Sequence, residues 1–80
     1  MDDGLKELLQ VMVEALVDNP DKVEVTEISG QQNNIYEIRV ARGELGRVIG
    51  KQGVLVQAIR TIMSGAAAKL GRRATIELLD

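Results

Sequence analysis

Apolar residues recur every three or four positions in two long stretches of the chain, and this spacing predicts two amphipathic helices. In residues 3–17 the leucines and valines make one stripe, as expected of a helix that covers a core. Asp2 or Asp3 is expected to cap its start, and Asp18-Asn19-Pro20 to end it, because proline disfavours helical geometry in the preceding residue. The second helix spans residues 54–70 and carries more apolar surface than one stripe requires.

Three shorter stretches favour β-strands. Residues 22–29, KVEVTEIS, are rich in β-branched side chains. Residues 35–41, IYEIRVA, alternate between apolar and polar, and the polar turn at 30–34 joins them to the first strand as an antiparallel hairpin. RATIELL, residues 73–79, alternates in the same way and is the last strand. A short helix at residues 44–49 completes the order α-β-β-α-α-β.

This order predicts a two-layer α+β sandwich, in which three strands carry the helices on one face. At 80 residues, with 45% apolar and 28% charged residues, the chain is expected to form one globular domain, residues 1–80. No apolar run approaches the roughly 18 residues of a membrane helix, and no signal peptide is recognisable, so a cytoplasmic location is expected.

The composition argues against catalysis. The chain has neither cysteine nor histidine, which excludes a thiolate metal site and removes the usual general base and zinc ligand. Thr61 and Ser64 lie in mid-helix with no base to activate them. We therefore expect no enzymatic activity, no cofactor and no bound metal.

Charge is distributed unevenly along the chain. Residues 1–38 hold nine acidic residues and two lysines, a net charge of −7, whereas residues 39–73 hold eight basic residues and Glu44, a net charge of +7. Residues 74–80 add two acidic residues. Such a basic segment suits a polyanion, although folding can also mix these charges over a merely soluble surface.

The sequence GRVIGKQG, residues 46–53, interrupts the helical pattern with a turn rich in glycine. Between two helices, Gly50-Lys51-Gln52-Gly53 leaves the backbone accessible, and the first amides of the following helix lack partners within it. That helix end is partly positive and suits a phosphate, to which Lys51 adds a charge. The alternative is that these glycines only make a tight helix connection. Gly46 within the short helix indicates that something packs closely against it.

The same residues argue against two other interpretations, a nucleotide-binding phosphate loop and a DNA-binding helix-turn-helix. A Walker-type phosphate loop needs G-x-x-x-x-G-K followed by serine or threonine, whereas Gln52 follows Lys51 here. A DNA-reading helix-turn-helix would present the apolar start of the second helix, residues 54–56, to base edges, with which it cannot form hydrogen bonds.

VIGKQGVLVQAI, residues 48–59, resembles the signature of the KH domain, an RNA-binding module. Together with ALVDNPDKVEV and AKLGRRATIELLD, it makes nearly the whole chain similar to the small stand-alone bacterial KH proteins, the KhpA-like RNA chaperones. The resemblance implies a type II KH fold, with a mixed sheet in which strand 35–41 runs parallel to strand 73–79.

The resemblance also implies a site. Gly50, Lys51, Gln52 and Gly53 would clamp the backbone of about four single-stranded nucleotides. The bases would lie in an aliphatic groove between the helices and the sheet, and the residues expected to line it are Val48, Ile49 and Leu55. Further RNA contacts are expected from Gly46, Arg47 and Arg60, with Arg39 as another candidate for the basic track.

The only aromatic residue, Tyr36, shares a strand face with Ile38 and Val40, so we expect it in the core and not beneath a base. The excess apolar surface of residues 54–70 favours a homodimer through Ile62 and Ala66. The resemblance also allows pairing with a larger KH-containing protein. Two hypotheses therefore remain: an RNA-binding module of low sequence specificity, or a protein-interaction module whose G-x-x-G loop has no function.

Overall fold

The structure is a computed structural model, and it describes residues 4–79 as helices packed on a three-stranded sheet. The order of elements is the predicted α-β-β-α-α-β, with two single turns of 3-10 helix between them. In chain order they are α1 (Leu5–Glu14), η1 (Pro20–Lys22), β1 (Glu24–Ser29), β2 (Asn33–Arg39), α2 (Leu45–Ile49), η2 (Lys51–Gly53), α3 (Val54–Ala68) and β3 (Arg73–Leu79).

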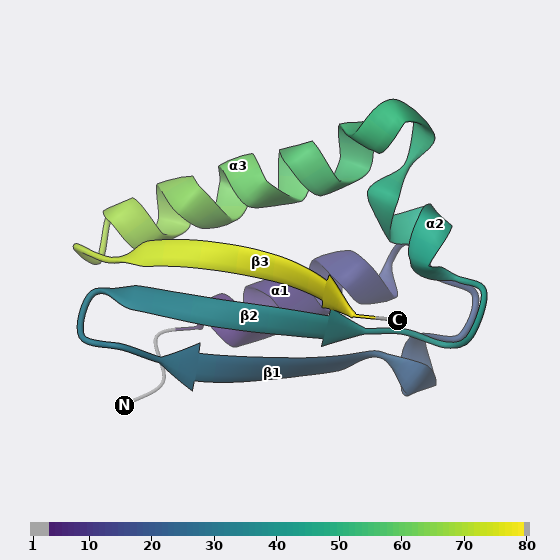
Figure 1. The fold of residues 1–80 in the computed structure, drawn as a ribbon, viewed down its shortest axis with the longest axis horizontal. Helices are drawn as coiled ribbons and strands as arrows, with labels where there is room; N and C mark the ends of the chain where they lie inside the picture. Colours follow the sequence, from purple (N-terminus) through teal and green to yellow (C-terminus); the bar gives the residue numbers. More distant parts are fainter. Residues whose placement is uncertain (1–3, 80) are drawn as a thin grey trace.

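The sheet is mixed, as expected. Its strand order is β1-β2-β3, with β1 antiparallel to β2 and β2 parallel to β3. Tyr36 of β2 sits at the centre, opposite Glu27 on one side and Ile76 on the other. The parallel connection runs through α2 and α3, and both long helices cover the same face of the sheet (Figure 1).

The core lies between α1, α3 and the sheet. Tyr36 and Ile38 of β2 are fully buried, and so are the residues that α1 and α3 place in the same cluster: Leu9, Val13, Met63 and Ala67. The Tyr36 hydroxyl donates to Glu27 Oε2 at 3.2 Å and accepts from Asn34 Nδ2 at 3.3 Å. The prediction that Tyr36 belongs to the core is therefore confirmed.

The helix boundaries differ slightly from those predicted. α1 ends at Glu14 and not at residue 17, and the Leu16 amide then bonds to the Val13 carbonyl at 3.0 Å in a tighter turn. The Glu44 carboxylate binds the amides of Asp18 and Asn19, which follow this turn. The predicted cap by Asp2 or Asp3 lies outside the described residues. Among the helices of residues 4–79, none combines the length and the apolar character that crossing a membrane requires.

Candidate functional site

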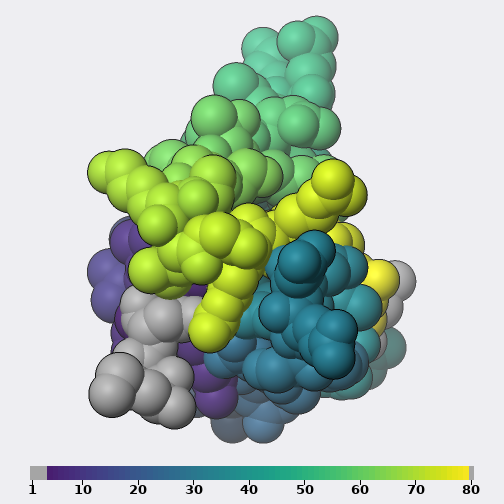
Figure 2. Space-filling model, turned by 90° about the vertical axis from the view of Figure 1, so that its left-hand side faces the viewer, coloured from purple at the N-terminus to yellow at the C-terminus, as the bar shows by residue number. Residues whose placement is uncertain are grey.

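The segment Gly50–Gly53, here called the G-x-x-G loop, joins α2 to α3 through three residues with positive φ. Gly50 has φ 76° and ψ 172°, Gln52 has φ 58° and ψ 23°, and Gly53 has φ 78° and ψ 13°. Only glycine commonly adopts the Gly50 conformation, whereas asparagine, aspartate and, less often, other residues adopt that of Gln52. The junction protrudes from the body of the molecule (Figure 2).

Gly50 is also fixed by packing. A Cβ atom at this position would lie 2.6 Å from Cγ of Leu55 and 2.9 Å from its Cβ, which is too close for any side chain. Leu55, in the first turn of α3, thus folds back over the start of the loop. At Gly53, in contrast, a Cβ would meet no atom within 4 Å, and only the positive φ restricts the residue.

Two backbone amides at the start of α3 are already bonded within the loop. The Gly53 amide donates to the Gly50 carbonyl at 3.1 Å, and the Val54 amide donates to the Lys51 carbonyl. The turn η2 thus supplies a partner, outside α3 itself, for the first amide of the long helix. At Val54 this amide is therefore not free to bind a phosphate, as the sequence had suggested.

The tip of the loop carries the exposed side chains of Lys51 and Gln52. Lys51 forms no salt bridge with any residue of the described chain. An exposed ammonium group and a neutral amide therefore stand on a turn that projects into solvent, an arrangement suited to an anionic chain.

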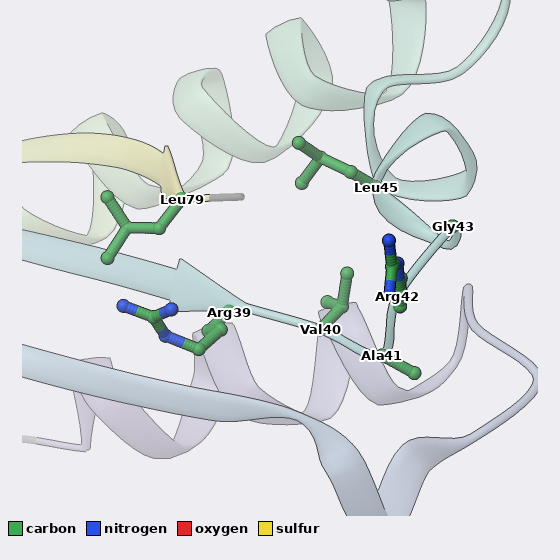
Figure 3. Close-up of a pocket in the computed structure, with 7 residues that line it drawn as sticks. All are labelled: Arg39, Val40, Ala41, Arg42, Gly43, Leu45 and Leu79. Atoms are coloured by element: carbon green, nitrogen blue, oxygen red, sulfur yellow. The ribbon is translucent and has the colours of Figure 1, made fainter.

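A hollow of about 460 Å³ lies at the carboxyl ends of β2 and β3, next to the start of α2 (Figure 3). We call it the α2–β3 hollow, and its lining residues are Arg39, Val40, Ala41, Arg42, Gly43, Leu45 and Leu79. Leu45 projects from α2 toward the end of β3, and Arg42 lies on the turn that leads into α2 (Figure 3). The hollow thus combines apolar side chains with two guanidinium groups.

The three expected groove residues do not line this hollow. Val48 is fully buried in the core and presents no surface to a ligand, whereas Ile49 and Leu55 are half-buried beside the loop. Leu45, which the sequence analysis missed, takes the position in the hollow. The sequence could have indicated Leu45, because it lies one helical turn before Ile49 and therefore on the same side of the helix.

The basic residues near the loop differ in their surroundings. Arg47 is exposed but forms a 3.0 Å salt bridge with Asp18, so its charge is partly compensated. Arg60 is half-buried on α3 and donates from Nη2 to the backbone carbonyl of Ile76 at 3.3 Å. The inference that a neighbour packs closely on Gly46 is wrong for the described chain, because a Cβ there would meet no atom within 4 Å.

Glu44 connects the site to the end of α1. Its buried carboxylate accepts the Asp18 amide at 2.6 Å and, through Oε1, both the Asn19 amide and its Nδ2 at 3.1 Å. Burial acts to raise the pKa of Glu44, but these hydrogen bonds, together with the nearby Arg47, lower it below its ordinary value of 4.5. The ionised carboxylate therefore anchors the start of α2.

A second hollow, of about 570 Å³, lies between α1 and α3 on another part of the surface. We call it the α1–α3 hollow. Both residues predicted for a dimer contact line it: Ile62 is 49% exposed, and Ala66 is half-buried. Leu8 and Leu70 add exposed apolar surface at its border.

A family model and individual proteins of the same family both match nearly the whole chain. The family model described as KhpA/KhpB, KH domain, matches residues 6–78. The RNA-binding protein KhpA of Aquifex aeolicus is 46% identical over 77 residues, which cover 96% of this chain and 98% of that protein. The RNA-binding protein KhpA of Caldanaerobacter subterraneus is 51% identical over 73 residues, which cover 91% of this chain and 97% of that protein. No solved structure gives a significant match.

Proposed function

The chain belongs to the KhpA/KhpB family of KH domains, and on that premise we propose that it binds single-stranded RNA. The relatives named as RNA-binding proteins match almost the whole chain, including the segment that forms the G-x-x-G loop. The observation that carries the proposal is the exposed Lys51-Gln52 tip on a turn that Gly50 and Gly53 hold in place.

In this proposal the loop holds the sugar-phosphate backbone. Lys51 neutralises a phosphate, and Gln52 donates a neutral hydrogen bond to the next one or to a ribose. We expect the bases to be sheltered by Leu45 and Leu79 in the α2–β3 hollow and by Ile49, the half-buried residue that precedes the loop. RNA without secondary structure fits best, because its unstacked bases can turn into such a surface, whereas paired bases cannot.

We expect low sequence specificity and a role as an RNA chaperone in the bacterial cytoplasm. The site has no aromatic platform, since Tyr36 is buried, so each base gains little stacking energy. Contacts to phosphates would then dominate the affinity, and such contacts do not depend on the base. A protein of this kind binds many single strands weakly, as a chaperone does.

The α1–α3 hollow supports a second part of the proposal, a homodimer through Ile62 and Ala66. Three apolar side chains stand exposed around it, and Gly65 and Ala66 leave room for a second helix to approach. Pairing would place two weak RNA sites in one particle and raise the affinity through effective concentration. A larger KH-containing protein is the other possible occupant of this surface.

Binding of short single-stranded RNA to a variant in which Lys51 and Gln52 are both aspartate tests the RNA-binding proposal. If the loop has no function and the domain serves only protein interaction, this variant binds RNA as the wild type does.

A further inference from the structure

Arg60 reaches from α3 to the outer edge of the sheet. Its Nη2 donates to the Ile76 carbonyl at 3.3 Å, and its side chain is half-buried between the helix and β3. Arg60 lies seven residues, or about two turns, after Gly53, and therefore on the same side of α3 as the end of the G-x-x-G loop. It is the basic residue that links the loop side of α3 to the strand.

β3 is an edge strand, with β2 on one side only. The Arg73 amide donates to the Gln32 carbonyl, so Arg73 and every second residue after it point their backbone groups toward β2. The backbone groups of the alternate residues, with Ile76 at their centre, point outward. An outward-facing row of amides and carbonyls can form hydrogen bonds with another molecule, including a nucleobase.

The Ile76 carbonyl, at the centre of this row, already accepts a hydrogen bond from Arg60. An adenine or cytosine presents an exocyclic amino group, which needs an acceptor such as the Ile76 carbonyl. To use it, the amino group must either share this oxygen with a charged donor or displace that donor. At the same ring position uracil and guanine carry a carbonyl oxygen, O4 or O6, in place of the amino group. This oxygen can accept from one of the remaining N–H groups of the guanidinium while the Ile76 contact persists.

We propose that Arg60 is a specificity-determining residue, which favours uracil and guanine over adenine and cytosine at the edge of β3. This inference rests on the proposed RNA binding and deepens it.

The test compares short homopolymers of uridine, cytidine and adenosine binding to the wild type, to Arg60→Met and to Lys22→Met. Methionine keeps most of the aliphatic stem and removes the donors. Lys22→Met removes the same charge from an exposed residue that lines neither the α2–β3 hollow nor the α1–α3 hollow. Because each RNA is compared with itself across the variants, differences in RNA stacking cancel.

We expect the wild type to prefer uridine, and Arg60→Met to reduce the ratio of uridine to adenosine affinity at least about fivefold, with the ratio unchanged in Lys22→Met. If the ratio stays constant in Arg60→Met, or falls equally in Lys22→Met, Arg60 contributes only charge and the inference is wrong. If the wild type binds none of the three RNAs, the proposed function itself fails, and this inference with it.

An NMR measurement on the wild-type protein tests the same proposal without relying on a variant that could fold incorrectly. The carbonyl carbon of Ile76 reports its hydrogen bond in an NMR spectrum. Adenosine RNA is expected to shift this signal, because its amino group joins or replaces Arg60 at the carbonyl oxygen, whereas uridine RNA leaves it nearly unchanged. Equal shifts with both RNAs would overturn the proposal.

Discussion

Leu55 packs directly on the Cα of Gly50, so that a Cβ at position 50 would lie 2.6 Å from Cγ of Leu55. The residue that opens the loop and a residue of the first turn of α3 therefore form one packed unit. This explains how a turn that protrudes into solvent keeps a defined shape, which is what a backbone clamp requires.

We predict that Gly50→Ala lowers the free energy of unfolding by about 3 kcal/mol, because it adds an overpacked contact to a backbone conformation that only glycine tolerates. Gly53→Ala, with open space around it, is expected to lose only about 1–2 kcal/mol through its positive φ. Denaturant unfolding of both variants measures the difference. The packing account requires that Leu55→Ala partly rescues Gly50→Ala in a double-mutant cycle; additive losses would refute it.

The lowered pKa of Glu44 predicts that the fold loses stability in acid. Because its pKa is lowered in the folded protein, its ionised form stabilises the fold above pH 4.5, and this contribution is lost as the pH falls through 4.5 and then through the lower folded pKa. Glu44→Gln should be less stable than the wild type at neutral pH, with the two proteins converging in acid. Thermal unfolding across this pH range measures the difference in stability between the two proteins. A constant difference at every pH would show that the carboxylate charge is unimportant.

The proposed dimer predicts that Ile62→Asp is monomeric, since a charge in the α1–α3 hollow cannot be buried against a second subunit without a large cost. Ser64→Asp is the matched control, because Ser64 is an exposed residue of the same helix outside this hollow. Sedimentation measures the oligomeric state of the wild type and both variants, and only Ile62→Asp is expected to be monomeric. A monomeric wild type at tens of micromolar would rule out a stable homodimer.

Salt dependence tests whether phosphates dominate RNA binding. For single strands the logarithm of the affinity falls by about 0.7 for each neutralised phosphate per tenfold increase in salt, so about three contacts predict a slope near −2. Lys51→Met should make the slope shallower by about 0.7, whereas Lys22→Met, an exposed residue outside the α2–α3 segment, should not. A slope near zero in the wild type would mean that base contacts, and not the backbone clamp, provide the affinity.

Much of the fold was predictable because its signals are local. The helical spacing and strand alternation identified every major element, and Tyr36 was placed correctly because it shares a strand face with Ile38. The parallel pairing of β2 with β3 followed from the family resemblance and not from periodicity.

The details of the site were less predictable because they depend on contacts between distant residues. In a helix as short as α2, the neighbouring residues Val48 and Ile49 point about 100° apart, and the pattern alone does not reveal which one faces the core. The Glu44 bonds to Asp18 and Asn19 and the Arg60 bond to Ile76 join segments that are far apart in the sequence. These contacts become visible only once the helices lie on the sheet.

The most direct test of RNA binding by the G-x-x-G loop is the affinity for short single-stranded RNA of the wild type, of the variant with Lys51→Asp and Gln52→Asp, and of a control with Lys22→Asp and Gln31→Asp. The control makes the same change in charge at exposed positions outside the loop. Aspartate tolerates the positive φ of Gln52, so the loop variant should remain folded. We predict that it binds at least about tenfold more weakly than the control, because a charge-assisted phosphate contact is lost. A folded loop variant that binds RNA as tightly as the control would contradict the clamp.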